Sequence, residues 1–275
     1  MPNLLLKPQA KTGHIHAISP KSVKPDCPNW TYVGFDVYKL APGDVLAHDT
    51  GDREHMLVLV TGVVTAQAGG QDLGPLGARM HVWDRAKGQA LYVPNGSNWQ
   101  VTAETDVELA VCSAPGFGGH DIRVIKPDDA PLEARGTGAN TRYVNAICME
   151  ERDWADSLLV TEVWTPQGNW SSYPSHKHDS DDFPNETYLE ETYYHRLNPP
   201  QGFAYQRVYN DDRSLDESMA ASDGDVVLVP EGYHPAGAPY GYDLYYLNVM
   251  AGPRRNWRFT NDPDHDWIYQ RDLKA

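Results

Sequence analysis

The chain has 275 residues, which is enough for one large domain or two small ones. Its basic and acidic side chains give a net charge of 23 − 38 = −15, so the surface should repel phosphate backbones and anionic membranes, and we expect neither as a partner. Apolar runs stay below the ~18 residues of a membrane-spanning helix, and the N-terminus does not resemble a signal peptide. The three cysteines (Cys27, Cys112 and Cys148) form no CxxC pair, which favours a reducing compartment. The sequence therefore predicts a cytoplasmic protein.

Short runs rich in Val, Leu, Tyr and Trp, separated by Gly and Pro, follow one another along the chain. They span 31–40, 54–62, 89–94 and 106–114 in the first half, and 158–166, 190–197, 202–209, 225–230 and 242–252 in the second. Strand-like runs at this even spacing predict an all-β sandwich or barrel. A polar stretch with Pro and Gly between the two halves is typical of a linker.

The two halves also resemble each other. Glu54 begins an aliphatic strand, and a Val-Pro-x-Gly turn follows with its proline at position 94, 94 − 54 = 40 residues later. Glu191 begins an aromatic strand, and the same turn recurs with its proline at position 230, 230 − 191 = 39 residues later. This self-similarity indicates a duplicated unit in which Glu54 matches Glu191, although chance recurrence of a strand and turn would look the same.

Three histidines and a glutamate in the second half predict a metal site. His176 and His178 are two residues apart, so in a strand their imidazoles would point to the same face. Glu191 opens the next strand, and His234 follows the Val-Pro-x-Gly turn. Three imidazoles and one carboxylate suit Zn²⁺, Fe²⁺ or Mn²⁺ and leave positions open for substrate or water.

Three glutamates are candidates for the carboxylate ligand. Glu186 and Glu190 compete with Glu191, and we prefer Glu191 because the aromatic strand runs directly from it. By strand alternation, Glu190 should face the opposite side. The first half offers His48-Asp49 near Glu54, and Asn98 where the second half has His234. We therefore expect the first half to hold no metal and to be structural.

The order His-x-His, Glu, Gly-x5-Pro-x-Gly, His resembles the two cupin motifs. Longer strings in the second half are similar to the 5-deoxy-glucuronate isomerase (IolB) family: "HKHD" at 176–179, "LEETYYHRLNPPQGFAYQRVY" at 189–209, "DGDVVLVPEGYHP" at 223–235 and "NDPDH" at 261–265. The resemblance implies a bicupin, two tandem double-stranded β-helix (jelly-roll) barrels. We place an N-terminal barrel without metal at 1–125, a linker at 126–145 and a C-terminal barrel with one divalent metal ion at 146–275. Glu191 follows His178 by 191 − 178 = 13 residues, a wider gap than the general cupin motif has.

The resemblance also implies a reaction, the conversion of 5-deoxy-D-glucuronate to 5-dehydro-2-deoxy-D-gluconate in myo-inositol catabolism. Such an aldose–ketose isomerisation would pass through an enediol(ate) and needs a group that moves a proton. Alternation from Glu191 places Tyr193 and His195 on the metal face as catalytic candidates. Core packing of Tyr193 and a position of His195 beyond the barrel rim are the alternatives.

Other residues are candidates for binding a sugar acid. Arg207 could hold the carboxylate in a bidentate pair, although a surface ion pair would also explain it. Tyr246 and Asn248 alternate together after the His234 turn and could contact hydroxyls. The competing functions are a cupin dioxygenase that uses Fe²⁺, a non-catalytic sugar-binding cupin and a structural bicupin. We expect a homo-oligomer, because cupins often associate through sheet edges.

Overall fold

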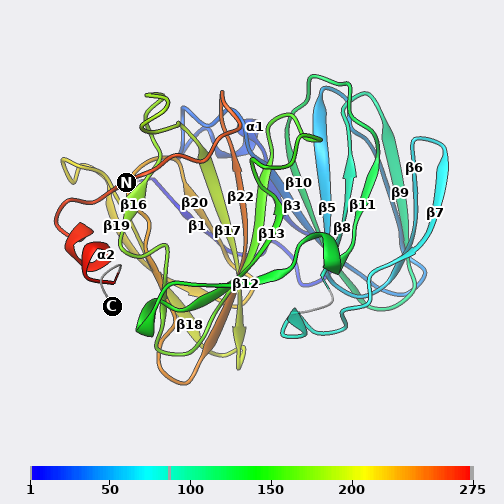
Figure 1. Cartoon of the computed structure of the whole chain (residues 1–275). Coiled ribbons are helices and arrows are strands. Elements are labelled where there is room, and N and C mark those ends of the chain that lie inside the picture. Colours follow the sequence, from blue (N-terminus) through cyan, green and yellow to red (C-terminus); the bar gives the residue numbers. More distant parts are fainter. Residues whose placement is uncertain (1, 86–87, 273–275) are drawn as a thin grey trace.

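The computed structural model describes residues 2–85 and 88–272, and β-strands dominate them (Figure 1). The all-β prediction is therefore confirmed. The N-terminal half forms a six-stranded sheet in the order β11 (Arg123–Ile125), β8 (Gln89–Val93), β5 (Arg53–Thr61), β10 (Val107–Pro115), β3 (Gly34–Leu40) and β2 (Gly13–Ile18). A four-stranded sheet accompanies it in the order β4 (Val45–Asp49), β9 (Asn98–Ala103), β6 (Val64–Ala68) and β7 (Gln71–Leu76).

The C-terminal half repeats this plan with a larger sheet. Seven strands lie in the order β1 (Leu5–Leu6), β20 (Val226–Val229), β17 (Glu190–Asn198), β22 (Asp243–Ala251), β14 (Leu159–Thr165), β13 (Arg142–Cys148) and β12 (Leu132–Arg135). A four-stranded sheet follows the order β15 (Trp170–Ser171), β21 (Ala236–Gly237), β18 (Phe203–Tyr209) and β19 (Asp216–Ser222). A short pair, β16 (His176–Lys177) and β23 (Thr260–Asn261), completes this half.

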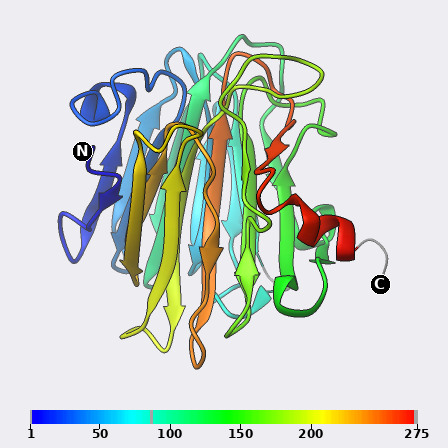
Figure 2. The same cartoon turned by 90° about the vertical axis from the view of Figure 1, so that its left-hand side faces the viewer.

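The described helices are short and peripheral. They are α1 (Pro20–Val23), α2 (Asp266–Asp272) and the 3-10 turns η2 (Pro127–Asp129) and η3 (Gly138–Asn140). Helix α2 lies on the outside of the C-terminal half, at the right of Figure 2. In the part of the chain that the structure describes, no helix has the length and apolar character needed to cross a membrane.

Strand alternation divides the core into layers. On β5, Leu57 and Leu59 pack in a cluster with Trp99 of β9, between the two sheets of the N-terminal half. Met56 and Val58, which point to the opposite face, join a larger cluster that includes residues of the seven-stranded sheet. The two large sheets therefore pack against each other through their outer faces. Both of their faces are buried, which explains the continuous apolar runs in their strands.

Two segments do not follow the predicted division of the chain. Strand β1 begins the sequence but pairs with β20 of the C-terminal half, so the N-terminus lies against that half (Figure 1). Strand β12 and the start of β13 fall within the predicted linker 126–145, yet they hydrogen-bond to each other in the seven-stranded sheet. The arrangement is consistent with two barrels, and the exact boundaries at 125 and 146 stay a prediction.

Candidate metal centre

The inner face of the seven-stranded sheet carries most of the predicted site residues. On β17, alternation directs Glu191, Tyr193 and His195 to one face. The antiparallel register with β22 places Tyr193 opposite Asn248 and His195 opposite Tyr246, so these side chains are neighbours on that face. The sequence therefore predicted correctly that these residues share one side of the sheet.

Three histidines from two segments of the chain meet above this face. The ring nitrogens of His176, His178 and His234 that could bind a metal all lie within 4.8 Å of one another. His176 is held by the pairing of β16 with β23, and His234 follows the turn after β20. His178 and His234 are buried, and their ring centroids are 4.9 Å apart.

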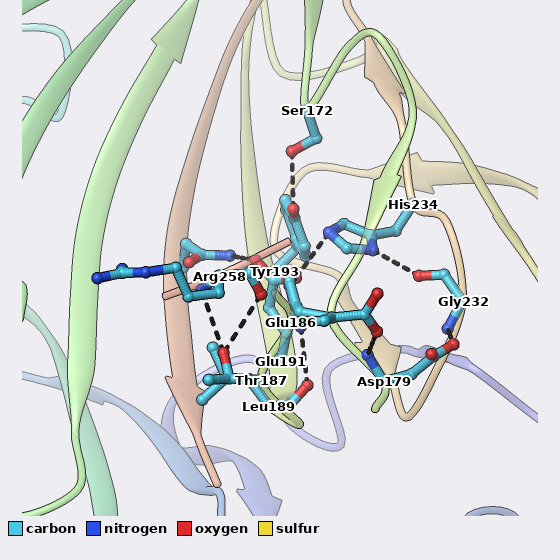
Figure 3. Close-up of polar contacts among 12 residues, drawn as sticks. Ser172, Asp179, Glu186, Thr187, Leu189, Glu191, Tyr193, Gly232, His234 and Arg258 are labelled. Atoms are coloured by element: carbon cyan, nitrogen blue, oxygen red, sulfur yellow. Dashed lines mark hydrogen bonds and ion pairs between the residues drawn. The ribbon is translucent and has the colours of Figure 1, made fainter. Parts of the chain in front are cut away.

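The carboxylate of Glu191 lies beside this cluster. Its Oε2 is 3.1 Å from His178 Nε2 and 3.0 Å from His234 Nε2 (Figure 3). Asn248 Nδ2 donates a hydrogen bond to Oε1 of the same carboxylate. Burial alone would raise the pKa of Glu191, but His234 and His178 hold that pKa well below its usual value. The carboxylate is therefore ionised and faces the imidazoles.

Backbone carbonyls set the orientation of two of the rings. His178 Nδ1 lies 3.0 Å from the carbonyl oxygen of Leu189, and His234 Nδ1 lies 2.8 Å from that of Gly232. A carbonyl can only accept, so both Nδ1 atoms carry a proton, and in the neutral rings Nε2 has a free lone pair. Among the described residues, the buried Nε2 of His234 makes no hydrogen bond of good geometry, although Glu191 Oε2 lies 3.0 Å away. This donor set fits a divalent cation, with the carbonyls in the supporting role usual at metal-binding histidines.

The two competing glutamates lie elsewhere. Glu190 accepts hydrogen bonds from three successive backbone amides, at 2.7 Å from Tyr32, 2.9 Å from Val33 and a shorter distance from Thr31. Glu186 accepts from the backbone amide of Asp179 at 2.9 Å. Among the three candidates, Glu191 is the one whose carboxylate contacts the histidines. The role of the four residues as metal ligands remains a proposal.

Two adjoining cavities open beside the cluster. The inner cavity, of about 50 Å³, is lined by Glu191, Tyr193, Tyr246, Asn248 and His176 together with apolar residues of the sheet. The Tyr193 hydroxyl is 2.8 Å from Ser172 Oγ, and the Tyr246 hydroxyl is 2.5 Å from Ser171 Oγ. Burial raises the pKa of both tyrosines, so each keeps its proton at neutral pH. The outer cavity, of about 300 Å³, shares His176 and continues past Phe259 towards helix α2.

Two predicted residues lie away from both the histidine cluster and the cavities. His195 is fully buried, with Nε2 2.8 Å from Gln206 Oε1, and burial lowers its pKa to about 4. Arg207 points away from the site, because its neighbour Gln206 faces inward and successive strand residues alternate. Its guanidinium makes two contacts of 2.7 Å with Asp216, so the surface ion pair, given above as the alternative, is what the structure contains.

The sequence reasoning missed a different arginine. Arg142 lines both cavities, together with His176 and Trp257, and Arg135 lines the inner one. Both arginines fall in the stretch predicted as a linker. The alternation of side chains between the two faces of β13, residues 142–148, was the sequence signal that could have revealed Arg142.

Comparison with known proteins shows the family of this chain. A model of the KduI/IolB family matches residues 4–268. This chain belongs to the KduI/IolB family. The 5-deoxy-glucuronate isomerase of Geobacillus kaustophilus (strain HTA426) is 52% identical over 263 residues, which cover 96% of this chain and 93% of the relative. That of Bacillus licheniformis is 46% identical over 271 residues, which cover 98% of this chain and the full length of the relative. The resemblance drawn from the sequence is thus confirmed.

Solved structures support the fold of this KduI/IolB member. The crystal structure of an IolB-like protein from Salmonella typhimurium LT2 superposes with a TM-score of 0.93 at 50% identity, and covers 97% of this chain and 99% of that one. The oxalate decarboxylase of Lactobacillus farciminis superposes with a TM-score of 0.64 at 13% identity, covering 98% of this chain and 91% of that one. At that identity the likeness concerns the fold alone.

The duplicated halves of this family member align differently from the prediction. His55 pairs with Val93 and Glu191 pairs with Val229, the first residues of the two Val-Pro-x-Gly turns, and 93 − 55 = 229 − 191 = 38. His55 therefore corresponds to Glu191. Glu54 corresponds to Glu190, so the predicted match of Glu54 with Glu191 is wrong by one residue. The error arose because adjacent glutamates, 190 and 191, begin β17.

The N-terminal half has a different arrangement where the C-terminal half has its histidine cluster. Trp99 Nε1 donates a hydrogen bond of 3.0 Å to His55 Nδ1, and the Trp99 and His48 rings are 5.1 Å apart. Asn98 is exposed and lies opposite Asp49, on the outer side of its sheet. The indole of Trp99 thus contacts the imidazole that corresponds to the Glu191 carboxylate.

Proposed function

We propose that this protein is a metal-dependent 5-deoxy-glucuronate isomerase, which converts 5-deoxy-D-glucuronate to 5-dehydro-2-deoxy-D-gluconate in myo-inositol catabolism. The observation that carries the proposal is the 52% identity to a relative of that name over nearly the whole of both chains. The buried cluster of His176, His178 and His234 beside Glu191 supports the metal dependence. Zn²⁺, Mn²⁺ and Fe²⁺ all suit this donor set.

The residues of the cavity suit an aldose–ketose isomerisation. A divalent ion held by the four side chains would stabilise negative charge on two adjacent substrate oxygens. Tyr193, whose hydroxyl keeps its proton at Oη, can donate a hydrogen bond to an oxygen in the inner cavity. Asn248 holds the Glu191 carboxylate in place, and the Tyr246 hydroxyl lies near enough to contact a second substrate oxygen.

The buried position of His195 suggests a supporting role. It stacks at 6.1 Å, ring centroid to centroid, on Tyr193 and lies 6.1 Å from Tyr246. Because burial lowers its pKa to about 4, His195 is neutral at physiological pH. We therefore assign the direct contact with the substrate to Tyr193, and we place His195 behind the two tyrosines as a positioning residue. A cytoplasmic location and a homo-oligomeric state stay predictions.

Turnover under anaerobic conditions tests the proposal. The protein, loaded in turn with Zn²⁺, Mn²⁺ or Fe²⁺, is incubated with 5-deoxy-glucuronate, and ketose formation is followed by NMR. We expect ketose to form in the absence of oxygen. In a parallel aerobic incubation, oxygen uptake that requires Fe²⁺ would indicate a dioxygenase, and binding of the sugar acid without any product would indicate a sugar-binding protein. Absence of ketose with all three metals would overturn the proposal.

A further inference from the structure

Arg142 occupies a particular place in the C-terminal half. It begins β13 and lies opposite Arg135 of β12, on the same side of the sheet as Val144, which lines the inner cavity. Arg142 is also one of three residues, with His176 and Trp257, that line both cavities. Any ligand that extends from the histidine cluster into the outer cavity therefore passes Arg142.

The guanidinium of Arg142 lacks the carboxylate partner that a partly buried arginine usually has. Nη1 donates a hydrogen bond of 3.1 Å to the carbonyl oxygen of Asn140. Within residues 2–85 and 88–272, no carboxylate forms an ion pair with Arg142. Arg135 pairs with Glu133 at 3.0 Å, and Arg207 pairs with Asp216. A cation that burial partly removes from water, with donors left over, is suited to an incoming anion.

The turn between β12 and β13 holds this arginine in position. Gly136 adopts φ +78°, and a Cβ there would lie 2.3 Å from the carbonyl oxygen of Asn140 and 2.6 Å from Arg142 Nη1. The backbone of the turn thus packs directly on the guanidinium. This contact and the Asn140 hydrogen bond limit the rotamers of Arg142, which reduces the entropy that ligand binding must overcome.

The sizes of the cavities indicate how a sugar acid would lie. The inner cavity of about 50 Å³ has room for about one or two waters, at ~30 Å³ each, and so for the reacting end of a sugar but not for the whole molecule. The outer cavity of about 300 Å³ can take the remainder. In a hexuronate the carboxylate lies at the opposite end from the aldehyde. Among the residues that line the outer cavity, Arg142 is the one arginine, and no lysine is present.

We propose that Arg142 binds the carboxylate of the sugar-acid substrate, at the junction of the two cavities, and so gives the site its preference for an acid over a neutral sugar. This inference rests on the proposed function and names the group that recognises the acid. A bidentate pair between the guanidinium and the carboxylate would also fix which end of the substrate reaches the histidines.

Steady-state kinetics with two substrates test the assignment. One is 5-deoxy-glucuronate, and the other is 5-deoxy-glucose, which has a hydroxymethyl group in place of the carboxylate. For Arg142→Gln we expect KM for the acid to rise by about tenfold to a hundredfold, the usual range for loss of a hydrogen bond to a charged group, with little change for the neutral sugar. Arg142→Lys, which keeps the charge with a single donor group, should retain part of the preference.

Arg207→Gln is the matched control, since that arginine lies outside both cavities and is paired with Asp216. We expect it to keep the wild-type ratio of the two KM values. An unchanged KM for the acid in Arg142→Gln would overturn the inference. An equal loss of kcat on both substrates would also overturn it, because Arg142 would then stabilise reaction charge rather than select the acid.

A binding measurement separates this inference from the isomerase proposal. Calorimetry with Zn²⁺-loaded protein compares D-glucuronate with D-glucose. We expect the wild type to bind the acid more tightly and Arg142→Gln to bind both alike. If the wild type shows this preference and Arg142→Gln loses it, but no ketose forms from 5-deoxy-glucuronate, the isomerase proposal fails and the Arg142 assignment stands. If the wild type has no preference for the acid, the assignment fails whatever the turnover.

Discussion

At the scale of single residues, burial beside a carboxylate distinguishes His234 from Asn98, its counterpart in the N-terminal half. Its Nε2 is buried beside Glu191, whereas Asn98 is exposed. We expect His234→Ala to weaken binding of the divalent ion by more than ~100-fold, beyond the 10–100-fold typical of outer groups, and to abolish turnover. Asn98→Ala should change neither. Metal analysis of untagged protein after dialysis checks this, and equal metal contents in the two variants would contradict it.

The burial of the His195 imidazole predicts that the stability of the fold depends on pH. Burial lowers its pKa from 6.5 to about 4, and its buried Nδ1 has no partner among the described residues that could share a proton. Because the pKa in the folded state is the depressed one, the contribution of neutral His195 to stability is complete above pH 6.5. It is lost as the pH falls from 6.5 towards 4, by about 1.4 kcal/mol per pH unit or ~3 kcal/mol in all.

Urea denaturation between pH 7.5 and 4.5, in the presence of a chelator, measures this effect. His195→Leu removes the titrating group, so its free energy of unfolding should fall less steeply over that range than that of the wild type. The difference between the two slopes isolates His195 from the other histidines. Parallel slopes would show that His195 is not held neutral by burial.

The residues of the proposed metal centre were predictable because strand alternation and the order of the motifs bear directly on them. His176, His178, Glu191 and His234 come together as the sequence indicated. The register of the repeat was not predictable to one residue, since Glu190 and Glu191 are both glutamates. Glu190 is distinguished in the structure by the backbone amides of residues 32 and 33 that face it, and such long-range contacts are not visible in the sequence.

At the scale of elements, the strands with apolar residues were predictable and the polar edge strand was not. Strand β12 is mostly exposed, and its sequence LEAR alternates over only four residues, between Pro131 and Gly136, which are typical of a loop. It is a strand because its backbone pairs with β13 at the edge of the sheet. For this reason the stretch resembled a linker, and Arg142 and Arg135, which belong to it, were missed as residues of the site.

Strand β1 belongs to the start of the chain but pairs with the C-terminal half, and we expect this pairing to contribute to stability. Leu4, which precedes it, is 2% exposed and packs in the large core cluster, and its carbonyl accepts a hydrogen bond of 2.9 Å from Leu228. We expect Leu4→Ala to lower the free energy of unfolding by about 2–4 kcal/mol, because truncation of a buried Leu leaves a cavity. Val45→Ala, at a side chain that is 59% exposed, should change it by less than ~0.5 kcal/mol. Urea denaturation of both variants measures the two changes. Equal losses in the free energy of unfolding would show that the N-terminal segment is not anchored.

At the scale of the whole molecule, the two halves hold each other through matching contacts. Glu54 accepts hydrogen bonds from the backbone amides of Asp156, Ser157 and Leu158, at 2.7, 2.6 and 2.6 Å. Glu190, its counterpart, accepts from residues 31–33 of the other half. In each half, the glutamate at the start of the central strand thus binds a segment of the other half, just before that segment enters a strand. Such reciprocal contacts are expected of two duplicated halves that pack tightly.

A buried ion pair crosses the same interface. Arg79, in the N-terminal half, contacts Glu162 of β14 at 2.5 Å, and both side chains are about 1% exposed. Tyr245 also donates to Glu162, at 2.8 Å. Removal of one member would leave the other charge buried without a partner, which costs about 3–5 kcal/mol. We therefore expect Arg79→Met to lower the free energy of unfolding by that amount.

The double variant Arg79→Met/Glu162→Gln should lose much less than the sum of the two single variants, because no charge is left unpaired and the glutamine oxygen can still accept from Tyr245. Since the pair joins the two halves, far-UV and near-UV circular dichroism should report one coincident transition in urea for the wild type. That transition should move as a whole in Arg79→Met. Two separate transitions, with only one of them shifted, would mean that the halves unfold independently and that their interface contributes little to the stability of the fold that carries the proposed metal centre.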